Sequence, residues 1–169
     1  DAMGGDFGPE VTVEALKQVL GSQPDVRASV FGDSAIIGSL IDGSFPSDIQ
    51  ARVDIVHCDT IVDCDEKPSS ALRSKQDSSM GLALKAVSIG NSQACISAGN
   101  TGALMALSLL YLGMLPGISR PAICAEIPTA LGNKLMLDLG ANVDCTADQL
   151  HQFALLGALT ANLALDIDN

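Results

Sequence analysis

Short apolar runs alternate along this chain with longer segments in which apolar residues recur every three or four positions. The recurring spacing is typical of amphipathic helices, and the short runs are typical of buried strands. We expect helices over residues 9–20, 34–41, 77–90, 103–112 and 146–165. We expect strands over residues 27–31, 53–56, 93–97, 121–127 and 134–139. Residues 42–50 are expected to form a polar loop, and residues 57–75 a long irregular segment.

This alternation predicts an α/β fold with a mostly parallel sheet flanked by helices. The last two strands lie on either side of Gly132 and Asn133, which have turn chemistry, so an antiparallel hairpin is expected near residues 121–139. We expect residues 1–169 to form a single α/β domain. The chain opens on a glycine-rich loop and trails off over residues 165–169, so we expect it to be a piece of a longer polypeptide.

The composition limits the classes of partner. The chain has 169 residues, of which 47% are hydrophobic, and a net charge of −11. Binding to nucleic acid needs a basic face, so no nucleic acid is expected as a partner. Residues 153–165 form the most apolar segment, which is too short to span a bilayer, and no signal peptide is visible. These features favour a cytoplasmic protein.

The cysteines and histidines indicate no metal site. The five cysteines include no Cys-X-X-Cys pair and are expected to be reduced and buried. His57 and His151 show no ligand spacing with the cysteines, and neither has a visible serine or aspartate partner. We therefore expect no metal and no cofactor.

The segment Ser97-Ala98-Gly99-Asn100-Thr101-Gly102 has the clearest chemical signal in the chain. It leads from a predicted strand into a predicted helix, and so presents unpaired backbone N–H groups at the positive end of that helix. Such an arrangement binds anions, and phosphate above all. The alternative is an asparagine or threonine cap on a buried helix, with glycine for close packing.

The loop of residues 4–9 also leads into a predicted helix. Gly4 and Gly5 would let the backbone approach a ligand, and Asp6 could hold a hydroxyl or a cation. Its spacing matches neither a Walker loop nor a dinucleotide fingerprint. A tight turn with an aspartate cap is the alternative.

Residues 138–144 form a further loop between a predicted strand and a predicted helix. Asp138, Asn142 and Asp144 are candidates for orienting a substrate. Capping of the helix over residues 146–165 explains Asp144 equally well.

Positive charge is concentrated in residues 67–79 of an otherwise acidic chain. Arg73 offers a planar fork that suits phosphate, Lys75 offers a point charge, and hydroxyl groups such as that of Ser70 lie between them. A local positive patch would attract an anionic substrate. An ordinary solvated loop is the alternative.

Loops that leave parallel strands and enter helices lie at one edge of the sheet. The loops of residues 4–9, 97–102 and 138–144 should therefore converge, and residues 67–79 could join them. Together they offer N–H groups, hydroxyls and cations but no obvious nucleophile. This set indicates that the bound anion itself attacks or is transferred.

Several of these segments resemble the bacterial phosphate acyltransferases, the PlsX family. The matching motifs occur in family order: Met3-Gly4-Gly5-Asp6-Phe7-Gly8-Pro9, Ser69-Ser70-Ala71-Leu72-Arg73, Ser78-Ser79-Met80, Ser97 to Met105, Gly117-Ile118-Ser119-Arg120-Pro121-Ala122 and Leu137 to Cys145. The chain looks like the N-terminal half of such an enzyme. The resemblance implies a fold like those of phosphate acetyltransferase and isopropylmalate dehydrogenase.

The same resemblance implies an activity in phospholipid biosynthesis. The family transfers a fatty acyl group from acyl carrier protein to inorganic phosphate, which yields acyl phosphate. It also implies a homodimer, a downstream membrane acyltransferase as a partner, and a peripheral membrane position for the full-length protein.

On this basis we expect Asn100, Thr101, Arg73 and Lys75 to take part in catalysis by holding the attacking phosphate. The expected phosphate- and substrate-binding residues are Gly4, Gly5, Asp6, Ser70, Ser97, Gly99, Gly102, Asp138, Asn142 and Asp144. Two other interpretations stay open: a nicotinamide-nucleotide dehydrogenase of related fold, and a non-catalytic fragment that binds phosphate or dimerises.

Overall fold

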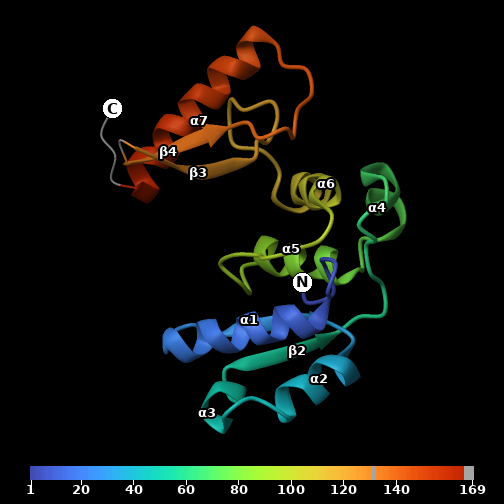
Figure 1. The fold of residues 1–169 in the computed structure, drawn as a ribbon. Helices are drawn as coiled ribbons and strands as arrows, with labels where there is room; N and C mark the ends of the chain where they lie inside the picture. The colour runs from blue at the N-terminus through green and yellow to red at the C-terminus, as the bar shows by residue number, and fades with distance from the viewer. Residues whose placement is uncertain (131, 166–169) are drawn as a thin grey trace. The chain divides into compact units, whose positions relative to one another are not determined.

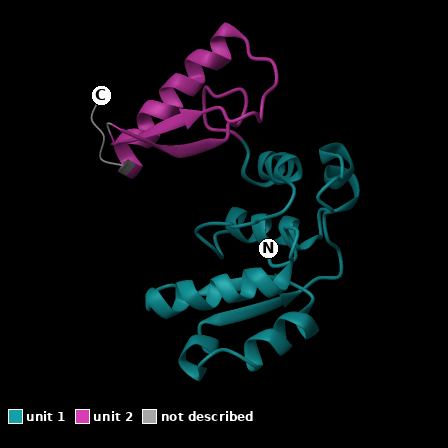
Figure 2. Ribbon diagram, in the orientation of Figure 1, with its two compact units in different colours: residues 1–113 teal, residues 114–169 magenta. Residues whose placement is uncertain are grey.

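The computed structural model describes residues 1–130 and 132–165. It divides into two compact units, residues 1–113 and residues 114–169, which are coloured separately in Figure 2. The single domain expected for residues 1–169 stays a prediction. The expectation about the trailing end of the chain falls on residues 166–169, which lie outside the described residues.

The first unit begins with a helix, α1 (Pro9–Ser22), and continues into a parallel pair of strands, β1 (Ala28–Gly32) and β2 (Val53–His57). Two helices, α2 (Ser34–Asp42) and α3 (Ser47–Gln50), connect these strands (Figure 1). Val30 pairs with Ile55 in the middle of the ladder. This βαβ connection confirms the predicted α/β class and the parallel pairing of these two strands.

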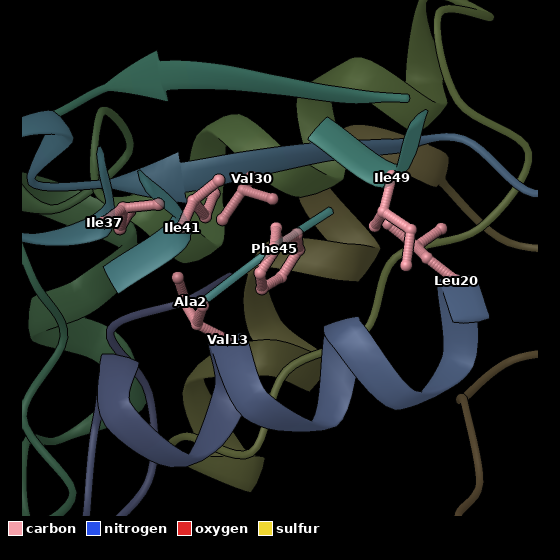
Figure 3. Packing of buried hydrophobic residues seen from close by; sticks show 8 residues of the cluster. All are labelled: Ala2, Val13, Leu20, Val30, Ile37, Ile41, Phe45 and Ile49. Atoms are coloured by element: carbon pink, nitrogen blue, oxygen red, sulfur yellow. The ribbon is translucent and has the colours of Figure 1, made fainter. Parts of the chain in front are cut away.

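Successive side chains of β1 point to opposite faces of the sheet. Apolar side chains lie on both faces, and helices cover each of them. Val30 joins the main hydrophobic core with residues of α1, α2 and α3, and Figure 3 shows these side chains gathered between α1 and the strands. Phe31 points to the opposite face, where it packs with Ala83 and Ala86 of α5 (Ser79–Ser88).

Residues 60–113 build a second core from three helices: α4 (Pro68–Ser74), α5 and α6 (Thr101–Leu112). Its buried side chains include Ala71 of α4, Met80 and Leu84 of α5, and Leu107 of α6. This packing holds the starts of α4 and α6 next to each other, since the ring of Pro68 lies against Gly102.

The second unit is an antiparallel hairpin, β3 (Cys124–Thr129) and β4 (Gly132–Leu137), followed by α7 (Ala147–Leu165). The predicted hairpin is confirmed, but Gly132 and Asn133 lie in the ladder, opposite Thr129 and Pro128, and not in the turn. Among the described residues, Ala130 is in a turn.

Three expectations about local structure are wrong. Residues 47–50 and 68–74 are short helices and not loops. Ile49 and Ala71 find buried positions, and Pro68 at the first turn favours the start of α4. Residues 93–97 form no strand, and Ile96 is 84% exposed. This apolar run pairs with no described strand, so nothing fixes it as part of a ladder.

The cysteines are free, as expected, but only in part buried. Cys58 is buried beside Phe31, whereas Cys64, Cys124 and Cys145 are exposed. The expectation of buried thiols is therefore wrong for these three, which lie in loops or at the start of the hairpin.

Candidate phosphate site at the start of helix α6

The loops of residues 4–9 and 97–102 lie side by side in the first unit. A methyl group added at Gly4 would come within 2.7 Å of the Gly99 nitrogen, and one added at Gly5 within 3.3 Å of Ala98. The Ser97 hydroxyl donates a hydrogen bond of 2.6 Å to the side chain of Asp1, shortly before the first loop. The predicted convergence of these two loops is confirmed.

A small pocket opens beside this contact. It is lined by Gly4, Gly5, Asp6, Phe7, Gly8, Val11, Thr12 and Ala98. Asp6 is exposed at its edge, and the N-cap of α1 is Gly8, with no side-chain hydrogen bond. The alternative in which Asp6 caps this helix is therefore wrong, and Asp6 is one of the residues that line the pocket.

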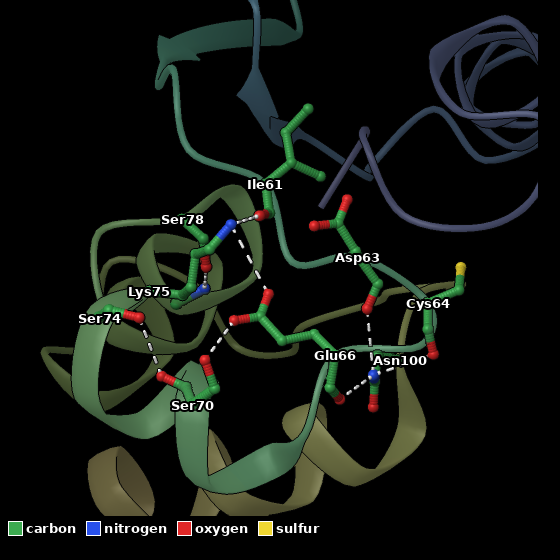
Figure 4. A network of polar contacts seen from close by, with 10 residues as sticks. Ile61, Asp63, Cys64, Glu66, Ser70, Ser74, Lys75, Ser78 and Asn100 are labelled. Atoms are coloured by element: carbon green, nitrogen blue, oxygen red, sulfur yellow. Dashed lines mark hydrogen bonds and ion pairs between the residues drawn. The ribbon is translucent and has the colours of Figure 1, made fainter.

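Asn100 caps α6 and ties it to the preceding chain. Its Oδ1 accepts the N–H of Ala103 at 2.9 Å. Its Nδ2 donates to the carbonyl oxygens of Asp63, Cys64 and Glu66 at 3.1, 3.0 and 2.8 Å, as Figure 4 shows. The capping function predicted as the alternative is confirmed, and every polar atom of this side chain is engaged within the protein.

The N–H groups at the start of α6 differ in what they bind. The N–H of Gly99 donates to the Ser97 hydroxyl at 3.1 Å, and that of Ala103 is taken by the cap. The N–H groups of Thr101 and Gly102 come too early in the helix to have an intrahelical acceptor. The Thr101 side chain is exposed. These two amides and this hydroxyl are the groups that the fold offers to an anion here.

Gly102 is also required by packing. A methyl group at this position would come within 2.8 Å of the Pro68 ring, so α6 can start against α4 only with glycine. The alternative interpretation of glycine for close packing is confirmed as well.

Two of the polar side chains predicted between residues 67 and 79 bind Glu66. The Ser70 hydroxyl donates to Glu66 Oε1 at 2.8 Å, and Lys75 Nζ lies 3.6 Å from Glu66 Oε2. Lys75 Nζ also donates to the carbonyl oxygen of Ile61 at 2.7 Å. Arg73 is exposed in the last turn of α4 and makes no hydrogen bond or ion pair with the described residues.

Glu66 lies at the centre of this polar network, and the sequence analysis did not single it out. The hydrogen bond from Ser70 is the main cause that holds the pKa of this carboxyl below its ordinary value; burial acts in the opposite direction, and the charge of Lys75 adds to the lowering. Glu66 and Ser70 stand four residues apart at the start of a helix, and this spacing was the available signal.

The predicted residues of the 138–144 loop belong to the second unit. Asp138 accepts hydrogen bonds from the backbone N–H of Ile123 and Asn142 at 2.8 Å, and Asn142 Nδ2 donates to Asp138 at 3.0 Å and to the carbonyl of Pro121 at 3.0 Å. Asp144 is exposed. The convergence of this loop with those of the first unit stays a prediction.

The pKa of Asp138 reflects this enclosure. Burial raises it, but the hydrogen bonds from Ile123, Asn142 and Ala141 outweigh burial, so the pKa lies below its ordinary value. The carboxylate of Asp138 therefore acts as the centre around which the loop folds.

The structure corrects the expectation that neither histidine has a serine or aspartate partner. His57, at the end of β2, has its Nδ1 3.0 Å from the Ser34 hydroxyl and its Nε2 3.0 Å from an Asp59 oxygen. The backbone N–H of Ser34 also donates to Nδ1 at 3.2 Å. Because all three side chains are exposed, these contacts tie the end of β2 to the start of α2 without forming an enclosed site.

Within residues 1–130 and 132–165, no group of three or more histidine, cysteine, aspartate or glutamate side chains could hold a metal ion. No helix among these residues is long and apolar enough to cross a membrane.

Comparison with known proteins gives a consistent result. The family model described as "Fatty acid synthesis protein" matches residues 1–169. The chain is 52% identical over 161 residues to a phosphate acyltransferase of Pseudomonas putida strain F1, which covers 95% of this chain and 48% of the relative.

Two more distant relatives have the same name. A phosphate acyltransferase of Pseudomonas syringae pv. syringae is 48% identical over 163 residues, covering 96% of this chain and 48% of the relative. One from Saccharophagus degradans is 48% identical over 157 residues, covering 93% and 45%. The chain thus spans about half the length of the curated relatives it matches.

Proposed function

The chain belongs to the family of fatty acid synthesis proteins, and we propose that the protein transfers a fatty acyl group from acyl carrier protein to inorganic phosphate. The product is an acyl phosphate for phospholipid synthesis. The names of the relatives support an acyltransferase over the dehydrogenase that the sequence left open.

The observation on which this proposal rests is the position of the two glycine-rich loops against each other. The contact between Gly4 and Gly99 places the backbone of the first loop close to the start of α6. The N–H groups of Thr101 and Gly102 there have no acceptor within the helix. Phosphate bound there accepts from these two amides and from the Thr101 hydroxyl. Arg73, which is exposed and unpaired among the described residues, neutralises part of its charge.

Asn100 takes a different part from the one expected. Because its amide and carbonyl are engaged with residues 63–66 and with Ala103, it holds the start of α6 in place for phosphate and does not itself bind it. Asn100 is thus a positioning residue in this proposal.

The reaction needs no nucleophile from the protein. An oxygen of the bound phosphate attacks the thioester carbonyl carbon, the carbon–sulfur bond breaks, and the thiolate of the carrier leaves and takes up a proton. N–H donors that face the developing oxyanion stabilise the transition state by about 3–4 kcal/mol each. Holding both reactants together supplies a further part of the acceleration.

The remaining expectations are part of the same proposal. We propose that the protein is the N-terminal portion of a larger cytoplasmic enzyme with the fold of phosphate acetyltransferase and isopropylmalate dehydrogenase. It forms a homodimer and passes its product to a membrane acyltransferase. Gly5 and Asp6 border the acyl substrate, and Asp138, Asn142 and Asp144 stay proposed substrate-binding residues of the second unit.

Single substitutions in the complete protein test the proposal. We expect Arg73→Ala to raise the KM for phosphate about ten- to hundredfold in acyl phosphate formation, because a hydrogen bond to a charged group contributes about 1.5–3 kcal/mol. Thr101→Ala should have a smaller effect in the same direction. Arg27→Ala, an exposed cation near the start of β1, is the matched control and should leave the KM unchanged. An unchanged KM for phosphate in both Arg73→Ala and Thr101→Ala would exclude this binding site for phosphate.

A further inference from the structure

The small pocket beside the contact of Gly4 with Gly99 is lined mainly by apolar groups. Its volume is about 180 Å³, and most of its lining is glycine backbone or the side chains of Phe7, Val11 and Ala98. Phe7 is 75% exposed and Val11 54%, so two large apolar side chains of the lining remain largely in water. Covering such side chains with an apolar ligand is favourable, which makes this pocket a candidate site for hydrocarbon.

The polar side chains of this pocket argue against a charged or strongly polar ligand. The Thr12 hydroxyl shares its proton between the carbonyl oxygens of Ala2 and Gly8, at 2.8 and 3.1 Å, so it has none left to donate. Asp6 is exposed and adds a negative charge, and no lysine or arginine of the described residues lines the pocket. An anion such as phosphate would be repelled here, and the amide groups of a polar ligand would find few side-chain partners.

This pocket lies close to the start of α6. Gly4 lines it, and a methyl group added at Gly4 would come within 2.7 Å of the Gly99 nitrogen. The nitrogen of Thr101 is two residues further along the chain, so it lies within about 10 Å of the Gly4 position. The carbon chain of an acyl donor can therefore enter the pocket while its carbonyl group meets a phosphate held by the N–H groups of Thr101 and Gly102.

The volume of the pocket limits the length of chain that fits. An apolar cavity of about 150 Å³ holds one benzene molecule, so this pocket of about 180 Å³ has room for a segment of about six carbons. We propose that it binds the first carbons of the fatty acyl chain, next to the thioester, and that Phe7 and Val11 form its apolar lining. The inference rests on the proposed function and assigns the residues that recognise the hydrocarbon part of the donor.

The test measures kcat/KM for acyl phosphate formation by the complete protein, with acyl carrier protein that bears saturated chains of increasing length as the donor. We expect kcat/KM to rise about two- to fourfold per methylene up to about six carbons, and less steeply beyond. Val11→Thr and Phe7→Gln should flatten this rise without changing the KM for phosphate, whereas Phe7→Leu should keep most of it. The matched control is Val19→Thr, the same change at a 48% exposed valine of α1 outside the pocket, and it should keep the native rise.

A second measurement separates this inference from the proposed function. Carrier protein that bears the same chains through an amide bond cannot react, and calorimetry should show its affinity rising with chain length in the native protein and Val19→Thr, but not in Val11→Thr or Phe7→Gln. If the native protein shows this dependence but forms no acyl phosphate, the proposed function fails and the pocket assignment holds. A native dependence in folded Val11→Thr and Phe7→Gln, or none in the native protein, overturns the inference. A raised KM for phosphate in these variants, with the chain-length dependence intact, also overturns it, because phosphate would then occupy the pocket.

Discussion

Replacing Gly4 with alanine should separate the two loops at the candidate site. The added methyl group would lie 2.7 Å from the backbone nitrogen of Gly99 and 2.9 Å from its α-carbon. Ordinary contacts begin at 3.4 Å, so backbone would have to move by about 0.7 Å. Overpacking of this kind costs about 1–3 kcal/mol of the free energy of unfolding. Because the displaced backbone lies next to the proposed phosphate site at the start of α6, we also expect phosphate binding to weaken.

Gly38→Ala is the control for this experiment. Gly38 lies within α2, and a methyl group there would meet no atom within 4 Å. Alanine in a helix should stabilise the protein by about 0.5–1 kcal/mol relative to glycine. The free energy of unfolding is measured in urea by circular dichroism, and phosphate binding by calorimetry. If Gly4→Ala were as stable as Gly38→Ala and bound phosphate normally, the close approach of the loops would be refuted.

Three other predictions concern residues that hold the loops in place. Arg52 donates to the carbonyl of Leu20 in the last turn of α1 and to those of Gln23, Pro24 and Val26 just after it, so Arg52→Ala should lower the free energy of unfolding by about 2 kcal/mol in urea titrations; no loss would contradict this. Asn100→Ala should lower the free energy of unfolding by about 1–2 kcal/mol for the lost cap, and by more because the hydrogen bonds of its amide nitrogen are lost as well. Asn100→Ser should recover only the contribution of the cap, so equal stability of the two variants would argue against the cap. Asp138 has a lowered pKa in the folded state, so its carboxylate stabilises the fold above pH about 4 and this stabilisation is lost as the pH falls through the folded-state pKa. The stability difference between Asp138→Asn and the native protein should therefore shrink in acid, and a pH-independent difference would contradict the assignment.

The parts of the fold that follow from local sequence were predictable. Pro9 at the first turn and the spacing of Val13 and Leu20 define α1, although the helix runs past Gly21 to Ser22. The contact of the Gly4 and Gly99 loops was expected from a sheet-edge argument, but residues 93–97 form no strand, so the contact itself is confirmed while the reason given for it is not.

The parts that depend on contacts between distant residues were not predictable. Helix α4 has seven residues and only Ala71 buried, so it shows no helical periodicity. Residues 93–97 have the composition of a strand, but a strand forms only with a partner, and composition does not show whether one is present. The network of Asn100, Lys75 and Glu66 depends on how residues 61–66 fold back over α4 and α6. Residue type therefore indicated a candidate site, while the tertiary structure shows which of its side chains are engaged within the protein.

A crystal structure of the complete protein soaked with inorganic phosphate tests the central claim most directly. The account predicts a tetrahedral ion within hydrogen-bonding distance of the backbone N–H groups of Thr101 and Gly102, beside Arg73. An ion bound elsewhere, with the start of α6 closed by protein side chains, would contradict it.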